Sequence, residues 1–409
     1  MDSKRTNRRQ LLKAGGAALA GLAAGSRSAS GQTFGSTRPD GPPTDVMLYG
    51  ERSRFVRTMR TRLGNKVNMT MHGSADGYDA LTPLAEQEGI ITPAPLHFVS
   101  SHGNPPPDID PSSHRLMIHG MVDRPLVFTL AELKRLPSVS RIMFIECLAN
   151  RPTPGAERTL TQLHGMISGS EWTGVPVSIL LKEAGVKAGA SWILGESAEA
   201  TRAGRSTPLA KAMDDAFVAY GQNGEPVRPH NGFPLRLVVP GFEGKYQVKW
   251  LRGIKVVDRP YITYWEQGTF TRAGRSQGAY FMEQGPKSVI TFPSGGQRLT
   301  SHGFQTVVGF AWSGSGAIRR VEVSTDGGKT WNDAQIQEPA LRIALTRFQY
   351  PWTWTGSEAV LQSRCTDEHG QIQPTAADHA RFWAPHTPPH GNMIQPWRIA
   401  SDGQVFNAL

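Results

Sequence analysis

The stretch that decides the fold is residues 141–151, Arg-Ile-Met-Phe-Ile-Glu-Cys-Leu-Ala-Asn-Arg. Its first half is apolar and β-rich, whereas Pro152-Thr-Pro-Gly155 directly after it favours a loop. The pattern predicts a largely buried strand with Cys147 at its end. A side chain at such a junction is held rigidly yet stays accessible, so Cys147 is a candidate functional residue. From the residue alone, a buried structural cysteine is the alternative.

The sequence around this strand mixes strands and helices without regular alternation, which indicates an α+β domain. Thr129-Leu-Ala-Glu132 is a capping box that predicts the start of a short helix. Gly185 is a helix-ending residue. We expect strands at 115–122 and 235–239, and helices at 175–184 and 209–217.

The composition changes near Pro286, after which short β-like runs such as 306–312 and 319–325 alternate with turn clusters. Asp326-Gly327-Gly328 predicts a hairpin that joins 321–324 to 329–331. These features are typical of a β-sandwich of roughly 100 residues. The expected organisation is a leader, a polar and proline-spotted arm, a first folded domain and the sandwich, at 1–31, 32–95, 96–284 and 285–409.

The first 31 residues read as a twin-arginine export leader, with Arg8 and Arg9 before a short apolar run. The run 11–24 contains Lys13 and glycines and is shorter than the ~20 residues of a membrane-spanning helix, so we expect no membrane span. Cleavage is expected near 29–32, which would make the protein periplasmic. Because this route exports folded proteins, the leader also suggests a cofactor.

The formal charge of +10 is not a nucleic-acid signal. The leader carries six cations and one anion and so accounts for half of the excess. No Lys/Arg run with interleaved aromatic residues remains, so we expect no nucleic-acid partner and favour an anionic substrate or an acidic redox partner. Cys147 and Cys365 are the two cysteines and fall in different predicted domains, although a disulfide between them stays an alternative. The chain has no Cys-x-x-Cys-His motif, so we expect no haem on it.

Three segments together resemble the sulfite oxidase family of molybdopterin oxidoreductases: Phe144-Ile-Glu-Cys-Leu-Ala-Asn-Arg151, Ser170-Glu-Trp-Thr-Gly-Val175, and Asn231-Gly-Phe-Pro-Leu-Arg-Leu-Val-Val-Pro-Gly241 with Gln247-Val-Lys-Trp-Leu251. Asp214-Asp-Ala216, Val218-Ala-Tyr-Gly-Gln-Asn-Gly224 and Ile394-Gln-Pro-Trp397 make the chain similar, within this family, to the molybdenum subunits of sulfane dehydrogenases. The resemblance implies a molybdopterin domain followed by an immunoglobulin-like β-sandwich that dimerises.

The same resemblance implies a role for each matching residue. The Cys147 thiolate would bind molybdenum, which suits a soft ligand. The implied cofactor-binding residues are Phe98, Val99, Ser100, Ser101, His102, Glu199, Asn231, Arg236, Gln247, Val248 and Lys249. Taken singly, Arg236 and Lys249 are also compatible with solvated basic residues, and His102 with an ordinary surface histidine.

The chain departs from sulfite oxidases at Ser100 and Pro152, where the family has arginine, and at Phe270, where it has tyrosine. The loss of two cations and a hydroxyl weakens a site for a small dianion, so a larger substrate such as carrier-bound sulfane sulfur is favoured. Arg151 and Arg398 are the remaining candidates to face the substrate.

The resemblance also implies a c-type cytochrome as electron acceptor and a homodimer or heterotetramer. The alternatives are a sulfite dehydrogenase, another oxo-transfer molybdoenzyme, and a catalytically silent subunit.

Overall fold

The computed structural model describes residues 50, 52–63, 79–101, 105–199, 204–261, 263, 266, 282–384 and 390–409. The chain divides into two compact units, 1–57 and 58–409. The predicted leader, His102 and Phe270 lie outside the described residues. Among the described residues, no helix has both the length and the apolar character needed to cross a membrane.

The second unit starts with short elements that precede the first large sheets. Leu81 and Leu84 are each 1% exposed, so this part of the predicted arm packs into the unit. The elements are β1 (Thr61–Arg62), which pairs with β2 (Ala80–Leu81), and the 3-10 helices η1 (Leu84–Glu86) and η2 (Ala94–Leu96).

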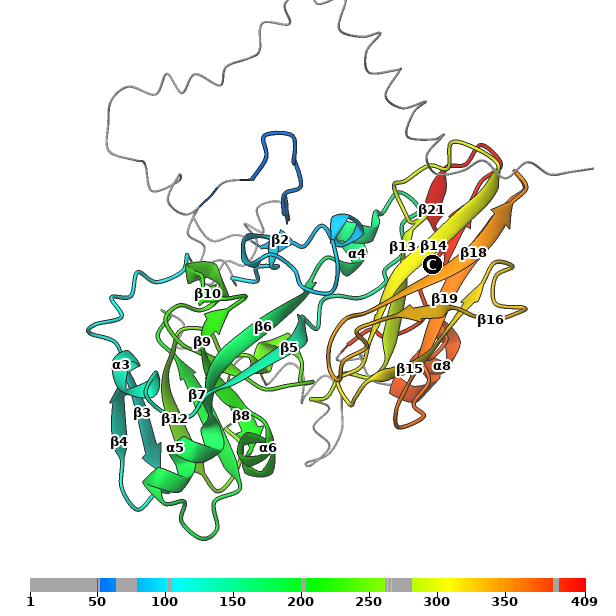
Figure 1. Cartoon of the computed structure of the whole chain (residues 1–409). Coiled ribbons are helices and arrows are strands. Elements are labelled where there is room, and N and C mark those ends of the chain that lie inside the picture. The colour runs from blue at the N-terminus through cyan, green and yellow to red at the C-terminus, as the bar shows by residue number, and fades with distance from the viewer. Residues whose placement is uncertain are drawn as a thin grey trace, which may run out of the picture. The chain divides into compact units, whose positions relative to one another are not determined.

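Two five-stranded sheets make up the described part of the first domain (Figure 1). One contains β5 (Val139–Glu146), β6 (Ile167–Pro176), β9 (Phe217–Gln222), β10 (Glu225–Pro226) and β11 (Arg236–Val238). The other contains β3 (Arg115–Gly120), β4 (Leu126–Thr129), β7 (Trp192–Ser197), β8 (Gly204–Pro208) and β12 (Leu251–Val257). Between the strands lie α3 (Leu130–Leu133), α4 (Leu160–His164), α5 (Val177–Ala184), α6 (Leu209–Asp214), η3 (Pro229–Asn231) and η4 (Gly244–Tyr246).

The capping box at the start of α3 is confirmed: Glu132 N donates to Thr129 Oγ1 at 3.1 Å, and Thr129 N donates to Glu132 Oε2 at 2.8 Å. Gly185 ends α5 with a φ of 71°, a conformation that glycine adopts without strain.

Two predicted helices are shorter than expected. The helix expected at 175–184 begins at Val177, because Val175 and Pro176 continue β6. The helix expected to reach Phe217 ends at Asp214, and Phe217 starts β9, where it pairs with Pro176. Pairing between distant strands therefore overrides the local helical pattern at both ends.

The strand that leads to Cys147 is confirmed. β5 pairs antiparallel with β6 from Val139 opposite Gly174 to Glu146 opposite Ile167. Cys147 is the next residue, and its N–H donates to Met166 O at 2.9 Å.

The C-terminal part is a β-sandwich of two sheets, drawn in yellow to red in Figure 1. One sheet contains β13 (Lys287–Phe292), β14 (Gly303–Trp312), β17 (Gln335–Gln337) and β18 (Thr346–Trp354). The other contains β15 (Ile318–Ser324), β16 (Asn332–Asp333), β19 (Ala359–Asp367), β20 (Trp397–Ile399) and β21 (Val405–Asn407), and α8 (Ala376–Trp383) follows β19 in the chain. Cys365 is buried in β19, and neither cysteine forms a disulfide.

The predicted hairpin is present, but its second strand begins a few residues later than predicted. Val323 pairs with Asn332 and Glu322 with Asp333, so the returning strand is β16 and not 329–331. The side chain of Asp326 accepts hydrogen bonds from the backbone N–H groups of Lys329 and Thr330, both at 3.0 Å. These bonds stabilise a wider loop than a two-residue turn.

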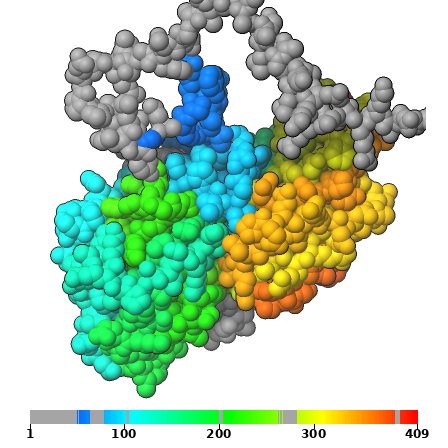
Figure 2. All heavy atoms as spheres, viewed as in Figure 1, coloured from blue at the N-terminus to red at the C-terminus, as the bar shows by residue number. Residues whose placement is uncertain are grey.

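One hydrophobic core joins the sandwich to the first domain. It includes Leu84, Phe144 and Ile167 together with Trp312 and Leu345 of the sandwich. The space-filling view shows the light-blue atoms that precede the first large sheets directly beside the yellow and orange atoms of the sandwich (Figure 2).

Candidate cofactor site

A cavity of about 100 Å³ lies at the end of β5. It brings together segments that are far apart in the sequence, including the loop after β5, β8, β11 and η4. The lining residues are His97, Phe98, Ser100, Cys147, Leu148, Ser197, Glu199, Arg205, His230, Arg236, Gly244, Lys245, Gln247, Val248 and Lys249.

Eight of the predicted site residues therefore meet at one cavity: Phe98, Ser100, Cys147, Glu199, Arg236, Gln247, Val248 and Lys249. They come from five separate stretches of sequence. Two of the three segments that carry the family resemblance, 144–151 and 231–241 with 247–251, thus contribute to one cavity.

Cys147 lines this cavity and is partly buried. Burial raises its pKa to about 11, and the carboxylates of Asp79, Glu243 and Glu146 act in the same direction. At neutral pH such a thiol is protonated unless a cation is bound to the sulfur. The site therefore suits a metal ligand better than a free nucleophile.

Arg236 lies on β11 and is only 4% exposed. Its Nη1 donates to Asn231 O at 2.9 Å, its guanidinium lies 5.0 Å from the ring centroid of Trp172, and its Nε is buried without a hydrogen-bond partner. Burial lowers its pKa to about 9. A buried guanidinium with an unused donor is suited to an anionic ligand.

Lys249 is the second cation at this cavity, and it is partly buried. Its Nζ donates to Ser100 O at 3.0 Å and to His230 O at 3.3 Å, and lies 4.2 Å from the ring centroid of Trp250. Burial, followed by the charge of Arg236, lowers its pKa to about 8. Among the described residues, neither Arg236 nor Lys249 forms an ion pair with a carboxylate, so both are suited to an anionic ligand such as a phosphate.

Arg205 is a third cation at the cavity, and the sequence reasoning missed it. It lies on β8, is 3% exposed, donates from Nη1 to Gly204 O at 2.6 Å, and has a buried Nε without a hydrogen-bond partner. Burial lowers its pKa, and the opposite charge of Glu266 is the largest influence in the other direction. No motif marks Gly204-Arg-Ser, so only its position beside η4 reveals it.

His97 was also missed, although it directly precedes the predicted segment 98–102. Burial lowers its pKa to about 3, so its imidazole is neutral. Its Nδ1 contacts Phe98 O at 2.9 Å, whereas Nε2 is buried without a hydrogen-bond partner. A neutral imidazole with one free nitrogen suits the polar edge of a heterocycle.

Gln247 and Val248 line the cavity mainly as scaffold. The Gln247 amide accepts from Val239 N at 2.7 Å and donates to Val239 O at 2.6 Å, so its hydrogen bonds go to the backbone. Val248 O accepts from Leu237 N at 2.9 Å, which ties this loop to β11.

The other predicted site residues that the structure describes are absent from the cavity lining. Val99 and Ser101 are buried, with Ser101 N donating to Asp79 Oδ1 at 2.8 Å. Asn231 is not among the lining residues, and its Nδ2 donates to Gln222 Oε1 at 2.8 Å and to Ala94 O at 3.2 Å.

The two arginines expected to face the substrate are also absent from the cavity lining. Arg151 follows the Cys147 loop and packs against Gly391. Arg398 lies on β20, where its Nη1 is 3.3 Å from Glu358 Oε1 and its guanidinium is 4.9 Å from the Phe406 ring centroid. The structure therefore gives Arg398 a surface ion pair in the sandwich.

Comparisons with known proteins agree with this geometry. Residues 102–265 match the family described as oxidoreductase molybdopterin binding domain, and residues 279–394 match the Mo-co oxidoreductase dimerisation domain. The chain superimposes on the crystal structure of the sulfane dehydrogenase SoxCD from Paracoccus pantotrophus with a TM-score of 0.81 and 37% identity, over 94% of this chain and 99% of that chain.

Curated relatives point to the same class. Mitochondrial sulfite oxidase of Mus musculus is 33% identical over 61% of this chain and 50% of its own length, and nitrate reductase [NADH] of Cichorium intybus is 34% identical over 66% and 33%. The chain thus spans about half the length, or less, of these relatives. The chain belongs to the sulfite oxidase family of molybdopterin oxidoreductases, with a molybdopterin-binding domain followed by a β-sandwich dimerisation domain.

Proposed function

We propose that this protein is a periplasmic molybdenum enzyme that oxidises carrier-bound sulfane sulfur and passes the electrons to a c-type cytochrome. The observation that carries this is a cavity lined by the Cys147 thiol and by three cations, the buried Arg205 and Arg236 and the partly buried Lys249. The likeness to a chain of SoxCD, a sulfane dehydrogenase by name, supports the choice of substrate.

The bound cofactor would supply a metal that takes two electrons from the substrate sulfur while an oxygen atom is transferred. The chain's own residues bind and orient it. Cys147 holds the metal as thiolate, and Arg236 and Lys249 hold the anionic end of the pterin. His97, kept neutral by burial, offers its free Nε2 to the pterin edge.

Arg205 is the cation available to the substrate. Lys245, the remaining cation in the lining, already has Glu243 as partner, with Nζ 2.7 Å from Oε2. Among the described residues, Arg205 forms no ion pair, and it lies on β8 against η4, whose Gly244 approaches the backbone of Glu146 and Cys147. A sulfur substrate with a negative end would therefore find its charge partner there.

Sulfite is the second candidate substrate, and Arg205 is the observation that favours it. Ser100 and Pro152 remove two cations that sulfite oxidases use, but Arg205 restores one. A single arginine suits one negative charge better than a compact dianion, which favours the persulfide.

The experiment that decides between the substrates compares kcat/KM of the metal-loaded protein for sulfite and for a protein-bound cysteine persulfide, with a c-type cytochrome as acceptor. We expect the persulfide to be preferred at least tenfold. A preference for sulfite would replace the proposed function by the alternative. If protein purified from its native host contains far less than one molybdenum atom per chain, the result would support the alternative of a catalytically silent subunit.

Replacing Arg205 by methionine is expected to raise KM for the anionic substrate about tenfold to a hundredfold, because a charged hydrogen bond is worth about 1.5–3 kcal/mol. Molybdenum content should stay at the wild-type level. Steady-state kinetics and metal analysis are the measurements, and Arg252→Met, on the exposed side of β12, is the matched control. An unchanged KM would contradict the assignment of Arg205 to the substrate. A loss of molybdenum would indicate that Arg205 binds the pterin instead.

Replacing Arg8 and Arg9 together by lysine is expected to leave the protein in the cytoplasm with its leader uncleaved, because the export route requires the arginine pair. Cell fractionation and mass spectrometry of the N-terminus measure this. Normal export of the double-lysine variant would argue against periplasmic location by this route.

A further inference from the structure

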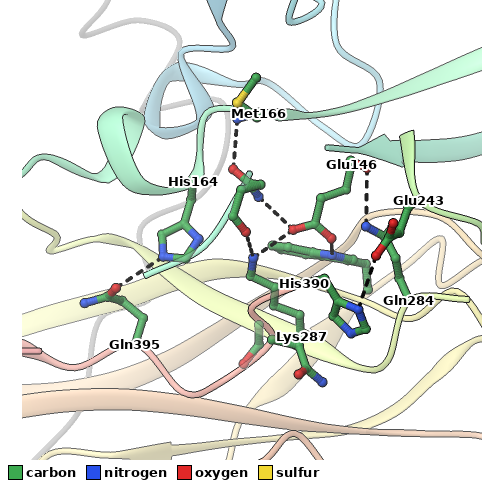
Figure 3. Close-up of polar contacts among 12 residues, drawn as sticks. Glu146, His164, Met166, Glu243, Gln284, Lys287, His390 and Gln395 are labelled. Carbon is green, nitrogen blue, oxygen red and sulfur yellow. Dashed lines mark hydrogen bonds and ion pairs between the residues drawn. The ribbon is translucent and has the colours of Figure 1, made fainter. Parts of the chain in front are cut away.

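The carboxylate of Glu146, directly before Cys147, is buried in a polar network that the proposed chemistry does not use (Figure 3). Its Oε1 accepts from Lys287 Nζ at 2.7 Å and from Asn150 Nδ2 at 2.7 Å. Its Oε2 accepts from Trp312 Nε1 at 2.8 Å. The carboxylate is thus held by three donors from three directions.

Two of these donors belong to the sandwich. Lys287 is the first residue of β13 and Trp312 the last of β14, and these residues pair with each other in the sheet. The Lys287 side chain is 2% exposed, and Trp312 is 0% exposed. The sandwich therefore presents a fixed pair of donors to the residue that precedes the thiol.

The same network fixes the loop after the thiol. Lys287 Nζ also donates to Asn150 O, and Asn150 Oδ1 accepts from Met166 N at 2.9 Å. Asn150 N donates to Cys147 O at 2.9 Å, and Gln284 Nε2 donates to Glu146 O at 3.3 Å. Hydrogen bonds therefore hold the backbone on both sides of Cys147, at Glu146 and at Asn150.

We propose that Glu146 and Lys287 are positioning residues through which the sandwich sets the direction of the Cys147 thiol toward the metal. The inference rests on the proposed binding of molybdenum by this cysteine. Burying an ion pair costs desolvation free energy, so such a pair often adds little net stability. We therefore assign to the pair of Glu146 and Lys287 the role of fixing one side-chain geometry. The chain's second domain then acts in the site as well as in dimerisation.

The test uses the full-length, metal-loaded Lys287→Met variant. We expect kcat per bound metal to fall at least tenfold with KM nearly unchanged, and the sulfur-to-metal charge-transfer absorption to shift. In metal-free protein, iodoacetamide should alkylate Cys147 at least threefold faster than in the wild type, as measured by peptide mass spectrometry. Cys365 is 1% exposed and is distinguished by its own peptide.

Arg364→Met is the matched control, since it removes another ion pair of the sandwich, in which Arg364 Nε lies 2.7 Å from Glu322 Oε2. This variant should unfold at a lower temperature but keep the wild-type kcat, absorption band and alkylation rate. If Lys287→Met behaves in the same way, the ion pair only stabilises the fold and the positioning role is wrong.

Trp312→Phe serves if Lys287→Met does not fold, because it removes only one donor to Glu146. Trp312→Phe should show the same changes in kcat, in the absorption band and in the alkylation rate, each smaller than in Lys287→Met. Wild-type values of all three quantities would overturn the inference. A wild-type protein without molybdenum would instead defeat the proposed function. A loaded wild type with unaffected variants defeats this inference alone.

Discussion

Cys147→Ser is expected to lower turnover by about a thousandfold or more, which corresponds to about 4 kcal/mol in the activation barrier. A serine hydroxyl is a hard and weakly acidic ligand, so it does not replace a thiolate on this metal. The absorption band that arises from charge transfer from the Cys147 sulfur to the metal should vanish at the same time. Steady-state kinetics per chain and the visible spectrum measure the two effects.

Cys365→Ala is the control, because Cys365 is buried in β19 of the sandwich, with no place in the cavity lining. It should cost some stability through the lost volume and leave turnover per metal unchanged. Activity that survives in Cys147→Ser, or is lost equally in Cys365→Ala, would contradict the assignment of the metal ligand.

Arg236→Met is expected to have opposite effects on the loaded and the metal-free protein. The variant should retain the cofactor about a hundredfold less tightly, because a bidentate, charge-assisted contact to phosphate is lost. The metal-free variant should be at least as stable as the metal-free wild type, since burying an uncompensated cation costs free energy. Molybdenum content after dialysis and the urea midpoint of unfolding measure the two effects.

Arg252→Met is again the control, because its guanidinium is exposed on β12 and should affect neither quantity. A strongly destabilised metal-free Arg236→Met would show that the guanidinium mainly supports the fold. In that case its bond to Asn231 O would outweigh the cost of burial.

Local sequence patterns predicted the parts of the fold that local physics determines. The β-rich run before Cys147 forms β5, and the Thr129–Glu132 capping box starts α3. The ends of α5 and α6 could not be read in this way, because the pairing of β6 with β9 decides them. That pairing joins residues 41 to 50 positions apart, from Pro176 opposite Phe217 to Trp172 opposite Gln222.

The candidate site divides in the same way. Arg236 and Lys249 were predicted from their motif and line the cavity, but the motif could not show that Asn231 uses its amide on Gln222 and Ala94. Arg205 carries no local signal, because its role comes from the packing of β8 against η4. The partners of Glu146 were equally hidden, since Lys287 is 141 residues away in the chain.

The core that contains both Phe144 and Trp312 links the order of synthesis to the maturation of the enzyme. A ribosome releases the strands of the sandwich last, so a nascent chain that ends before β14 lacks the partners that enclose the end of β5. A truncated chain therefore cannot present its thiol in the finished setting. We therefore expect only completed chains to hold Cys147 in the arrangement that would bind the metal.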